Sequence, residues 1–181
     1  MAYHFRSAAE ADIPAVAKIF DAARAFLKEQ GIEQWQGAMH PSVETERTDI
    51  SVQTAYVLED DSSHIVAAVS IVPGEDPFYS KLEGAWLSDG PYATIHRVAV
   101  SKDVRGQGIS KILLLRCITR ARELGVRSVR IDTHPDNKIM QAAIRGAGFT
   151  ECGRLRVYDN TTRLGYELVF KDIDSPPSVD L

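Results

Sequence analysis

The sequence is poor in the residues that build disulfide frameworks and metal sites. It has two cysteines in 181 residues, Cys117 and Cys152. Cys117 falls on the apolar stripe of a predicted helix and Cys152 in a predicted strand, so we interpret both as unpaired, buried and inert thiols. The five histidines show neither His-x-x-x-His spacing nor a neighbouring cysteine pair. No zinc motif is therefore recognisable, and we expect no metal.

Long apolar runs and an excess of positive charge are also missing. No stretch approaches the roughly 20 apolar residues of a membrane span, and the first residues lack the apolar core of a signal peptide. The formal net charge is −4, which gives no basic field for nucleic acid. These absences predict a cytoplasmic protein that binds neither nucleic acid nor membrane. They leave a homodimer open.

The chain contains enough apolar residues to form one hydrophobic core. The apolar fraction is 44 %, as in ordinary soluble domains, and the length suits a single domain. There are no internal repeats, and the amino-acid composition does not change abruptly along the chain. We therefore expect one domain over 1–171, followed by a frayed tail over 172–181 that is rich in Pro, Ser and Asp.

Hydrophobic periodicity predicts the order β-α-α-β-β-β-α-β-α-β-β. Asp12 is expected to cap the first helix and Gly31 to stop it. The other predicted helices cover 42–54, 109–125 and 137–147. The predicted strands cover 3–7, 55–59, 64–72, 94–101, 128–133, 150–158 and 163–170. Segment 73–91 has no clean period and is interpreted as an ordered insertion. This order predicts an α/β (α+β) domain with one mixed, mostly antiparallel sheet flanked by helices.

The run Arg105-Gly106-Gln107-Gly108-Ile109-Ser110 lies between an apolar strand and a strongly periodic helix. Two glycines allow a tight turn and a close approach of the backbone to a ligand. The following helix directs unpaired amides and the positive end of its dipole at the same point, which suits a phosphate. We therefore predict a pyrophosphate cradle over 103–110. The alternative is an ordinary glycine turn before a helix.

Two better-known phosphate loops do not fit this run. It lacks the Gly-Lys-Ser/Thr ending that binds a nucleoside triphosphate with magnesium. It also lacks the third glycine and the acidic residue of the dinucleotide fingerprint.

The spacing Arg-x-x-Gly-x-Ser, preceded by Val98-Ala99-Val100, instead resembles the acyl-coenzyme A loop of the GNAT superfamily of N-acetyltransferases. That family has Gln/Arg-x-x-Gly-x-Gly/Ala, and Ser110 replaces its last small residue. Asp136-Asn137 and Gly148-Phe149 match the opening and the end of the family's next motif. The match extends over about 2–171. It implies a GNAT-like fold and an acetyl-CoA-dependent N-acetyltransferase that transfers acetyl directly to a primary amine in a ternary complex.

The resemblance also implies where the coenzyme binds. The strand edge at Val98, Ala99 and Val100 would pair with the pantetheine arm. The loop residues facing the pyrophosphate would be Val104, Arg105, Gly106, Gln107, Gly108, Ile109 and Ser110. Asn137 would reach the coenzyme arm. A surface arginine is the alternative interpretation for Arg105, and a simple helix cap is the alternative for Asn137.

The sequence leaves three candidates for the general base: two histidines, or deprotonation through water. Strand alternation would place Thr94, His96, Val98 and Val100 on one face. Some family members carry a carboxylate base at the position of Thr94, which cannot take this role here. His96, two residues on, can accept a proton near neutral pH. His134, just after the next strand, is a second candidate. Deprotonation through water without a dedicated base is a third possibility.

The general acid departs from the family pattern. Many GNAT enzymes have a helix tyrosine seven residues after the asparagine, and this chain has Ile144 there. Tyr158 is the nearest replacement in sequence, although a half-buried strand aromatic is the alternative interpretation. The loss keeps a second function open, a non-catalytic module that binds or senses acyl-CoA.

The acceptor is expected to be a small-molecule amine or a peptide N-terminus. Aromatic residues in irregular segments could line its pocket: Trp35, Tyr79, Trp86 and Tyr92. Acidic residues in the same segments could attract a cation: Glu33, Glu75, Asp76, Glu83 and Asp89. The aromatics could equally cover the edge of the core.

Overall fold

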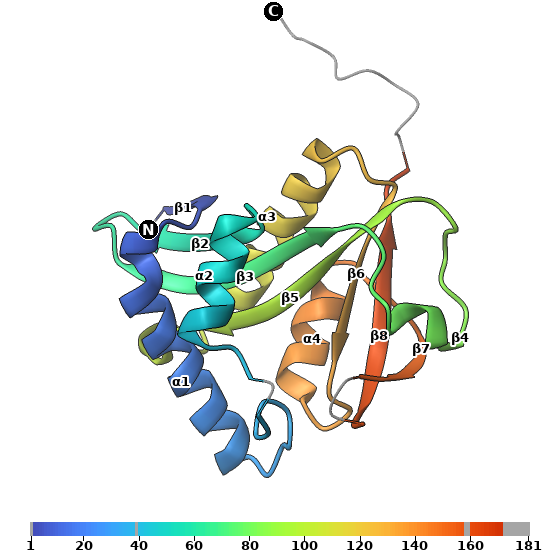
Figure 1. The fold of residues 1–181 in the computed structure, drawn as a ribbon, viewed down its shortest axis with the longest axis horizontal. Coiled ribbons are helices and arrows are strands. Elements are labelled where there is room, and N and C mark those ends of the chain that lie inside the picture. Colours follow the sequence, from blue (N-terminus) through green and yellow to red (C-terminus); the bar gives the residue numbers. More distant parts are fainter. Residues whose placement is uncertain (1, 39, 158–159, 172–181) are drawn as a thin grey trace, which may run out of the picture.

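The computed structural model describes residues 2–38, 40–157 and 160–171. These residues form one eight-stranded sheet with the order β1-β2-β3-β5-β6-β8-β7-β4 (Figure 1). Its strands are β1 (Tyr3–Ser7), β2 (Ala55–Asp60), β3 (Ile65–Pro73), β4 (Glu83–Gly84), β5 (Tyr92–Val100), β6 (Ser128–Thr133), β7 (Thr150–Arg156) and β8 (Thr162–Val169). Neighbouring strands are antiparallel except β5 and β6, which are parallel. The predicted mixed, mostly antiparallel sheet is confirmed.

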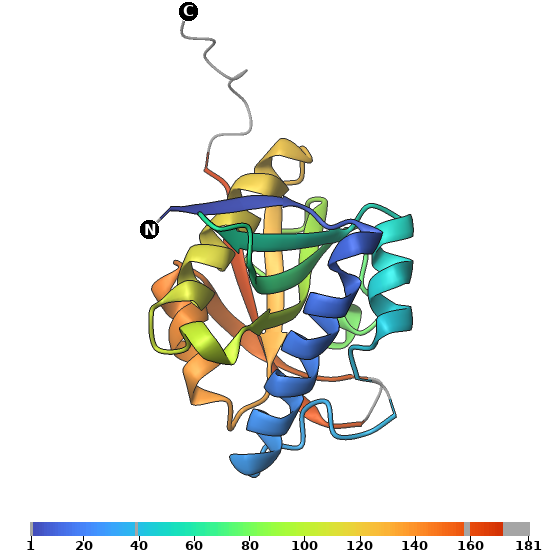
Figure 2. The ribbon, with the colours of Figure 1, turned by 90° about the vertical axis from the view of Figure 1, so that its left-hand side faces the viewer.

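Two pairs of helices cover opposite faces of this sheet. The helices are α1 (Ile13–Glu29), α2 (Val43–Ser51), α3 (Ile109–Glu123) and α4 (Lys138–Gly146). Figure 2 shows α1 and α2 on one side of the sheet and α3 and α4 on the other. The predicted element order is confirmed with one addition, the two-residue strand β4. No helix of the described residues combines the length and the apolarity needed to cross a membrane.

Apolar side chains pack in two layers, one on each face of the sheet. The larger cluster lies under α3 and α4 and includes the fully buried Leu113, Leu114 and Ile144. The smaller cluster lies under α1 and includes Phe20 and Ala99. Burial on this scale provides most of the stabilisation of a domain of this size. The free Cys117 belongs to the larger cluster, as predicted for an inert thiol.

The start of α1 differs from the prediction. Asp12 occupies the N-cap position, but its side chain makes no capping hydrogen bond to the helix. Its carboxylate instead accepts hydrogen bonds from Arg6 of β1 at 2.7 and 3.0 Å and from the Ala9 amide at 2.8 Å. Hydrogen bonding to Arg6 lowers the pKa of Asp12, because it favours the charged carboxylate. Asp12 therefore ties the helix to the edge strand, an interaction that local sequence does not reveal.

The insertion between β3 and β5 is ordered by polar anchors on the sheet. The buried Glu167 of β8 accepts hydrogen bonds from the Leu87 amide at 2.5 Å and from the Ser88 hydroxyl at 2.7 Å. The indole nitrogen of Trp86 donates to the Tyr79 carbonyl at 2.9 Å. Tyr79 is 1 % exposed and packs against Trp86 and Tyr92. The insertion thereby forms a fixed cover over one half of the sheet.

Helix α2 buries two carboxyl groups, Glu46 and Asp49, which are 3 % and 6 % exposed. Glu46 Oε1 has no hydrogen-bond partner within the described part of the chain. Burial, together with the neighbouring Asp49 carboxylate, raises the pKa of Glu46 to about 7. A carboxyl that folding keeps protonated costs stability once the pH exceeds its ordinary pKa.

We expect Glu46→Gln to stabilise the protein in a pH-dependent way. In the native state Glu46 holds its proton up to about pH 7, whereas in the unfolded chain it loses it from its ordinary value of 4.5. The free energy of unfolding therefore falls as the pH rises through this window, by at most about 1.4 kcal/mol per pH unit. Glutamine should have little effect at about pH 5 and add roughly 1–3 kcal/mol at about pH 8, measured by urea unfolding.

Glu44→Gln is the matched control, because Glu44 lies on the same helix but is exposed. It should show no gain at the higher pH. An equal effect of Glu46→Gln at both pH values would contradict the proposed titration.

Candidate functional site

A cleft opens where β5 and β6 separate. The two strands pair from Tyr92 and Ser128 to Ile95 and Ile131, and the described pairing ends there. The rest of β5, His96–Val100, therefore presents an open edge. A cavity of about 1110 Å³ follows this edge, somewhat larger than the roughly 300–1,000 Å³ of an ordinary small-molecule pocket.

A β-bulge lies at the point of separation. Ser70 of β3 pairs with His96 and Ala68 pairs with Ala99, so Arg97 and Val98 together oppose one residue. Arg97 has φ +57°, a left-handed conformation that is uncommon for a non-glycine residue. Neither Arg97 nor Val98 has a cross-strand partner in the described registers with β3 and β6. Arg97 and Val98 therefore lie outside the regular one-to-one pairing of β5 with its neighbours.

The bulge corrects the alternation predicted for this strand. Val98 and Val100 pack with Ile95 against the cluster under α3, and Ala99 packs under α1. Thr94 and His96 therefore do not share a face with Val98 and Val100, because the extra residue shifts the alternation by one. The prediction failed because strict period-two alternation assumes a regular strand.

The predicted phosphate loop has the expected backbone geometry. Gly106 and Gly108 have φ +77° and +75°, and Gly108 is the N-cap of α3. Within the described residues, the amides of Gly106, Gly108, Ile109 and Ser110 donate to no backbone carbonyl and no side chain. Free amides at a helix N-terminus suit an anion. The loop can therefore hold a pyrophosphate group without help from a lysine.

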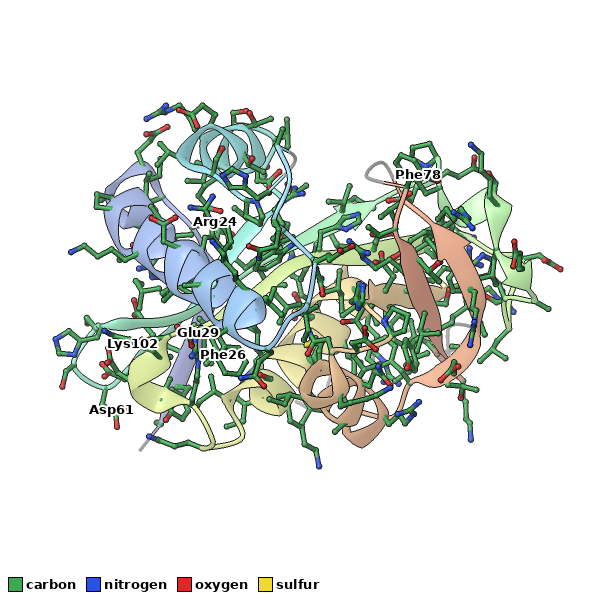
Figure 3. The ribbon with its side chains drawn as sticks, turned by 90° about the horizontal axis from the view of Figure 1, so that it is seen from below. Arg24, Phe26, Glu29, Asp61, Phe78 and Lys102 are labelled. Atoms are coloured by element: carbon green, nitrogen blue, oxygen red, sulfur yellow. The ribbon has the colours of Figure 1, made fainter. Side chains whose placement is uncertain are left out.

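Most of the predicted coenzyme residues line this one cleft. They are Val98, Ala99, Val100, Val104, Arg105, Gly106, Gly108, Ile109, Ser110 and Asn137. Gln107 lies on the loop but outside the lining. Figure 3 shows Phe26 near the end of the cleft that contains this loop, and Phe78 on the opposite side of the molecule.

Arg105 and Asn137 have structural partners of their own. The Arg105 guanidinium donates to the Ala22 carbonyl at 3.1 Å and lies 4.2 Å from the ring centre of Phe26. It thereby joins the loop to α1. Asn137 caps α4, because its Oδ1 accepts the Met140 amide at 3.1 Å. Its Nδ2 lies 3.4 Å from Gln34 Oε1 across the cleft.

Ionisable side chains gather at the end of the cleft away from the loop. His96 lines it, and its Nε2 lies 3.1 Å from Asp76 Oδ2. Burial alone would raise the pKa of Asp76, but hydrogen bonds from His96 and from the Phe78 amide hold it below its usual value. Asp76 is therefore a carboxylate that can orient the imidazole.

Asp132, at the end of β6, forms a second polar group there. Its Oδ2 accepts the hydroxyl of Tyr79 at 2.9 Å, and its Oδ1 is 3.7 Å from Nε of Arg163. Burial raises the pKa of Asp132, and the nearby His96 and the Tyr79 hydroxyl offset this only in part. Burial also raises the pKa of Tyr79 well above its usual value, so its hydroxyl stays protonated. A perturbed carboxyl in a cleft is typical of functional sites.

The structure does not place His134 in the cleft. His134 Nδ1 accepts the Asp136 amide at 3.1 Å, and His134 is not among the described residues that line the cleft. Tyr158 lies outside the described residues. Ile144, at the position of the family tyrosine, is fully buried in the core under α4.

Several site residues were only partly anticipated. Trp35, Asp76 and Tyr79 line the cleft as the sequence allowed, whereas Trp86 and Tyr92 do not. Asp132 and Arg163 were missed as site residues. The alternation of Arg130 and Asp132 with the apolar Val129 and Ile131 could have indicated a polar face on β6.

Comparison with known proteins places this geometry in context. The model of the acetyltransferase (GNAT) family matches residues 19–149. No curated protein matches the chain. A GNAT-family acetyltransferase structure from Streptococcus agalactiae is 27 % identical, with TM-score 0.83, over 94 % of this chain and 96 % of the other.

Two further structures share the fold. A ribosomal-protein-alanine N-acetyltransferase from Brucella melitensis is 24 % identical, with TM-score 0.68, over 92 % of this chain and 99 % of the other. A chain of the NatC complex bound to Gag peptide and CoA is 14 % identical, with TM-score 0.67, over 94 % and 99 %. The first structure is the nearer of the three in both sequence and shape.

We expect Gly108→Trp to abolish binding of coenzyme A, because a bulky side chain at the N-cap would occupy the space beside the free amides. Gly125→Trp is a matched control at the other end of α3. Both glycines have φ +75°, and a Cβ at either would meet nothing within 4 Å. The two variants should therefore carry similar backbone strain.

Isothermal titration calorimetry with coenzyme A distinguishes a loss of coenzyme binding from a general effect of backbone strain. Gly108→Trp should weaken binding by about 100-fold or more, while Gly125→Trp should bind like the wild type. Equal affinities of both variants would remove the loop from the site.

Proposed function

Because the chain belongs to the acetyltransferase (GNAT) family, we propose that it transfers an acetyl group from acetyl-CoA to a primary amine in a direct ternary complex. The observation that carries this proposal is the arrangement of the cleft. Free amides at a glycine loop lie at one end, ionisable side chains lie at the other, and an open strand edge runs between them. A thioester and an amine bound along this edge would meet beside His96 and Val98.

The residues present suit the coenzyme. The amides of Gly106, Gly108, Ile109 and Ser110 are free to receive a diphosphate. The edge of β5 at Val98–Val100, which does not pair with β6, can hydrogen-bond the amides of the pantetheine arm. Acetyl-CoA, when bound, supplies the activated acetyl thioester. Arg105 would reach the phosphates only by leaving the Ala22 carbonyl.

The bulge provides a donor for the developing negative charge. When the amine attacks the thioester carbonyl, the carbonyl oxygen becomes an oxyanion that a preorganised N–H can stabilise. Val98 lines the cleft and has no cross-strand partner in the described registers. We assign its backbone N–H as this donor.

His96 is the best-placed base. With Nε2–H donating to Asp76, the lone pair of His96 is on Nδ1. The amine nitrogen forms its bond to the acetyl carbon, its proton passes to His96, and the carbon–sulfur bond breaks to release a thiolate. Asp76 acts as a positioning residue that fixes the tautomer. His134 is the weaker candidate, because it does not line the described cleft.

The acceptor is a small-molecule amine or a peptide N-terminus. The wall around its site combines aromatic surface from Trp35 and Phe78 with the carboxylates of Asp76 and Asp132. This combination suits an ammonium group that carries an apolar substituent. The structurally similar enzyme from Brucella melitensis, whose name gives a ribosomal protein as its substrate, supports including peptide N-termini among the candidates.

One observation favours a second function. Ile144 stands where many family members have the tyrosine that protonates the departing thiolate, and its side chain is fully buried. A module that binds acyl-CoA without catalysis would need the loop and the open edge but no acid. Turnover separates the two functions.

We expect the purified protein to release coenzyme A thiol from acetyl-CoA in the presence of an accepted amine. Labelled acetyl-CoA added with amino acids, polyamines and short peptides, followed by mass spectrometry, would identify the acceptor. Binding of coenzyme A without thiol release across the whole panel would instead establish the binding module.

Substitution of the histidines tests the base. His96→Gln should lower kcat by about 100-fold or more, since the transition state loses its proton acceptor, while the Kd for coenzyme A stays within about threefold. Asp76→Asn should lower kcat by about 10-fold, because an amide can present the wrong partner to the imidazole. His134→Gln is the control and should be silent. A silent His96→Gln beside a damaging His134→Gln would move the base to His134.

A further inference from the structure

Arg97, the bulge residue of β5, is held by a carboxylate from α2. Its Nε donates to Asp49 Oδ2 at 2.7 Å and its Nη2 to Asp49 Oδ1 at 2.6 Å. This is the bidentate geometry in which arginine and a carboxylate bind most specifically. Ser70 of β3 adds a hydrogen bond to Asp49 Oδ2 at 2.5 Å. Asp49 is 6 % exposed and Ser70 1 % exposed, whereas the Arg97 side chain is 24 % exposed, so the carboxylate side of the contact is shielded from water.

The backbone at Arg97 needs such support. A left-handed φ of +57° is strained for arginine, and strained residues persist only when the surrounding structure fixes them. The sheet does not provide this, because Arg97 and Val98 have no described cross-strand partner. The described hydrogen bonds of the Arg97 side chain go to Asp49 and Ser70 alone.

We propose that Asp49 is a positioning residue for acetyl transfer, which holds the bulge through Arg97 and thereby fixes the backbone N–H of Val98. The inference rests on the function proposed above, since Val98 matters only as the oxyanion donor. A displacement of about 1 Å in such a donor can cost about 100-fold in rate. Asp49 thus acts on the reaction without touching the substrate.

The same helix borders the acceptor end of the cleft. Ser42, the N-cap of α2, and Thr45 in its first turn both line the cleft. The Asp49–Arg97 pair therefore connects α2, whose first turn lines the cleft, to β5, which carries the Val98 N–H.

A purely structural ion pair is the competing explanation. Removal of one partner from a buried pair destabilises a protein whatever its role. The experiment therefore separates kcat from coenzyme affinity, at a temperature where every variant is folded.

The variants are Asp49→Asn, Arg97→Gln and their combination. Each single variant should lower kcat by about 100-fold and leave the Kd for coenzyme A within about threefold. The double variant should be no slower than the slower single variant, because the two residues act as a unit. Glu10→Gln and Arg47→Gln are the matched controls. Arg47 of α2 lies 3.7 Å from Glu10 at the exposed side of the same helix, and both controls should stay within about twofold of the wild type.

An NMR experiment tests the same role of Asp49 without knowledge of the acceptor. In ¹H–¹⁵N spectra of the wild type, the Val98 amide should shift between the coenzyme A and acetyl-CoA complexes, and in Asp49→Asn this difference should vanish. If the wild type never releases thiol, the proposed catalysis fails, while the spectra still show whether Asp49 holds the Val98 N–H in position. Where Asp49→Asn does not fold, Ser70→Ala replaces it, because it removes the hydrogen bonds of the hydroxyl to Asp49 and from Arg97 and leaves both charges. It should lower kcat by about fivefold and diminish the Val98 difference.

Three results would overturn the proposal. One is a kcat of Asp49→Asn within about threefold of the wild type. Another is a loss of coenzyme affinity as large as the loss of kcat. The third is a Val98 difference that is unchanged in Asp49→Asn, or in Ser70→Ala where that variant replaces it.

Discussion

The separation of β5 from β6 is the constraint on which the rest of the site depends. The two strands pair only from Tyr92 to Ile95 on β5, and the bulge at Arg97 follows immediately. A regular ladder would have saturated the backbone groups of His96–Val100 and closed the cleft. Because the ladder stops, the same strand can contribute core residues at one end and an open edge at the other. The glycine loop and α3 then follow directly from this edge in the chain, so the cradle and the edge are placed together.

The two faces of the sheet bury different kinds of side chains. Under α3 and α4 the packing is apolar and dense, with Leu113, Leu114 and Ile144 fully buried. On the opposite face, carboxyls from distant segments are buried (Glu46, Asp49 and Glu167) or half-buried (Asp132). Burying charge is unfavourable unless hydrogen bonds and partners compensate. The face under α3 and α4 thus has the larger apolar core, and the other face combines a smaller apolar cluster with polar groups held by their partners.

Local patterns were sufficient for the element order, the glycine loop and its helix, because periodicity and glycine spacing are properties of neighbouring residues. The sequence was insufficient wherever a contact joins distant segments. Asp12 was predicted as a helix cap but binds Arg6 of the edge strand. The contact of Arg105 with the Ala22 carbonyl of α1 was likewise not predicted, and its role as a phosphate ligand stays a prediction. Period-two alternation does not reveal the bulge at Arg97, and the carboxylate that binds the Arg97 side chain lies 48 residues away in Asp49. His96 was identifiable as a histidine near the family's base position, whereas its partner Asp76 required the folded insertion.

The absence of a tyrosine at Ile144 fits this difference between the apolar packing under α4 and the polar groups on the other face. A phenol at that position would place a polar group among the apolar side chains under α4, where the described neighbours offer a packed core. The polar groups of this chain instead enter the cleft from the insertion and from β6, through Asp76, Tyr79 and Asp132. The buried Tyr79 hydroxyl donates to Asp132, and its raised pKa makes it a poor acid for a thiolate. In the mechanism proposed above, catalysis in this cleft would therefore depend on removing a proton from the amine and stabilising the oxyanion, and the thiolate would leave without a proton donor from the described residues.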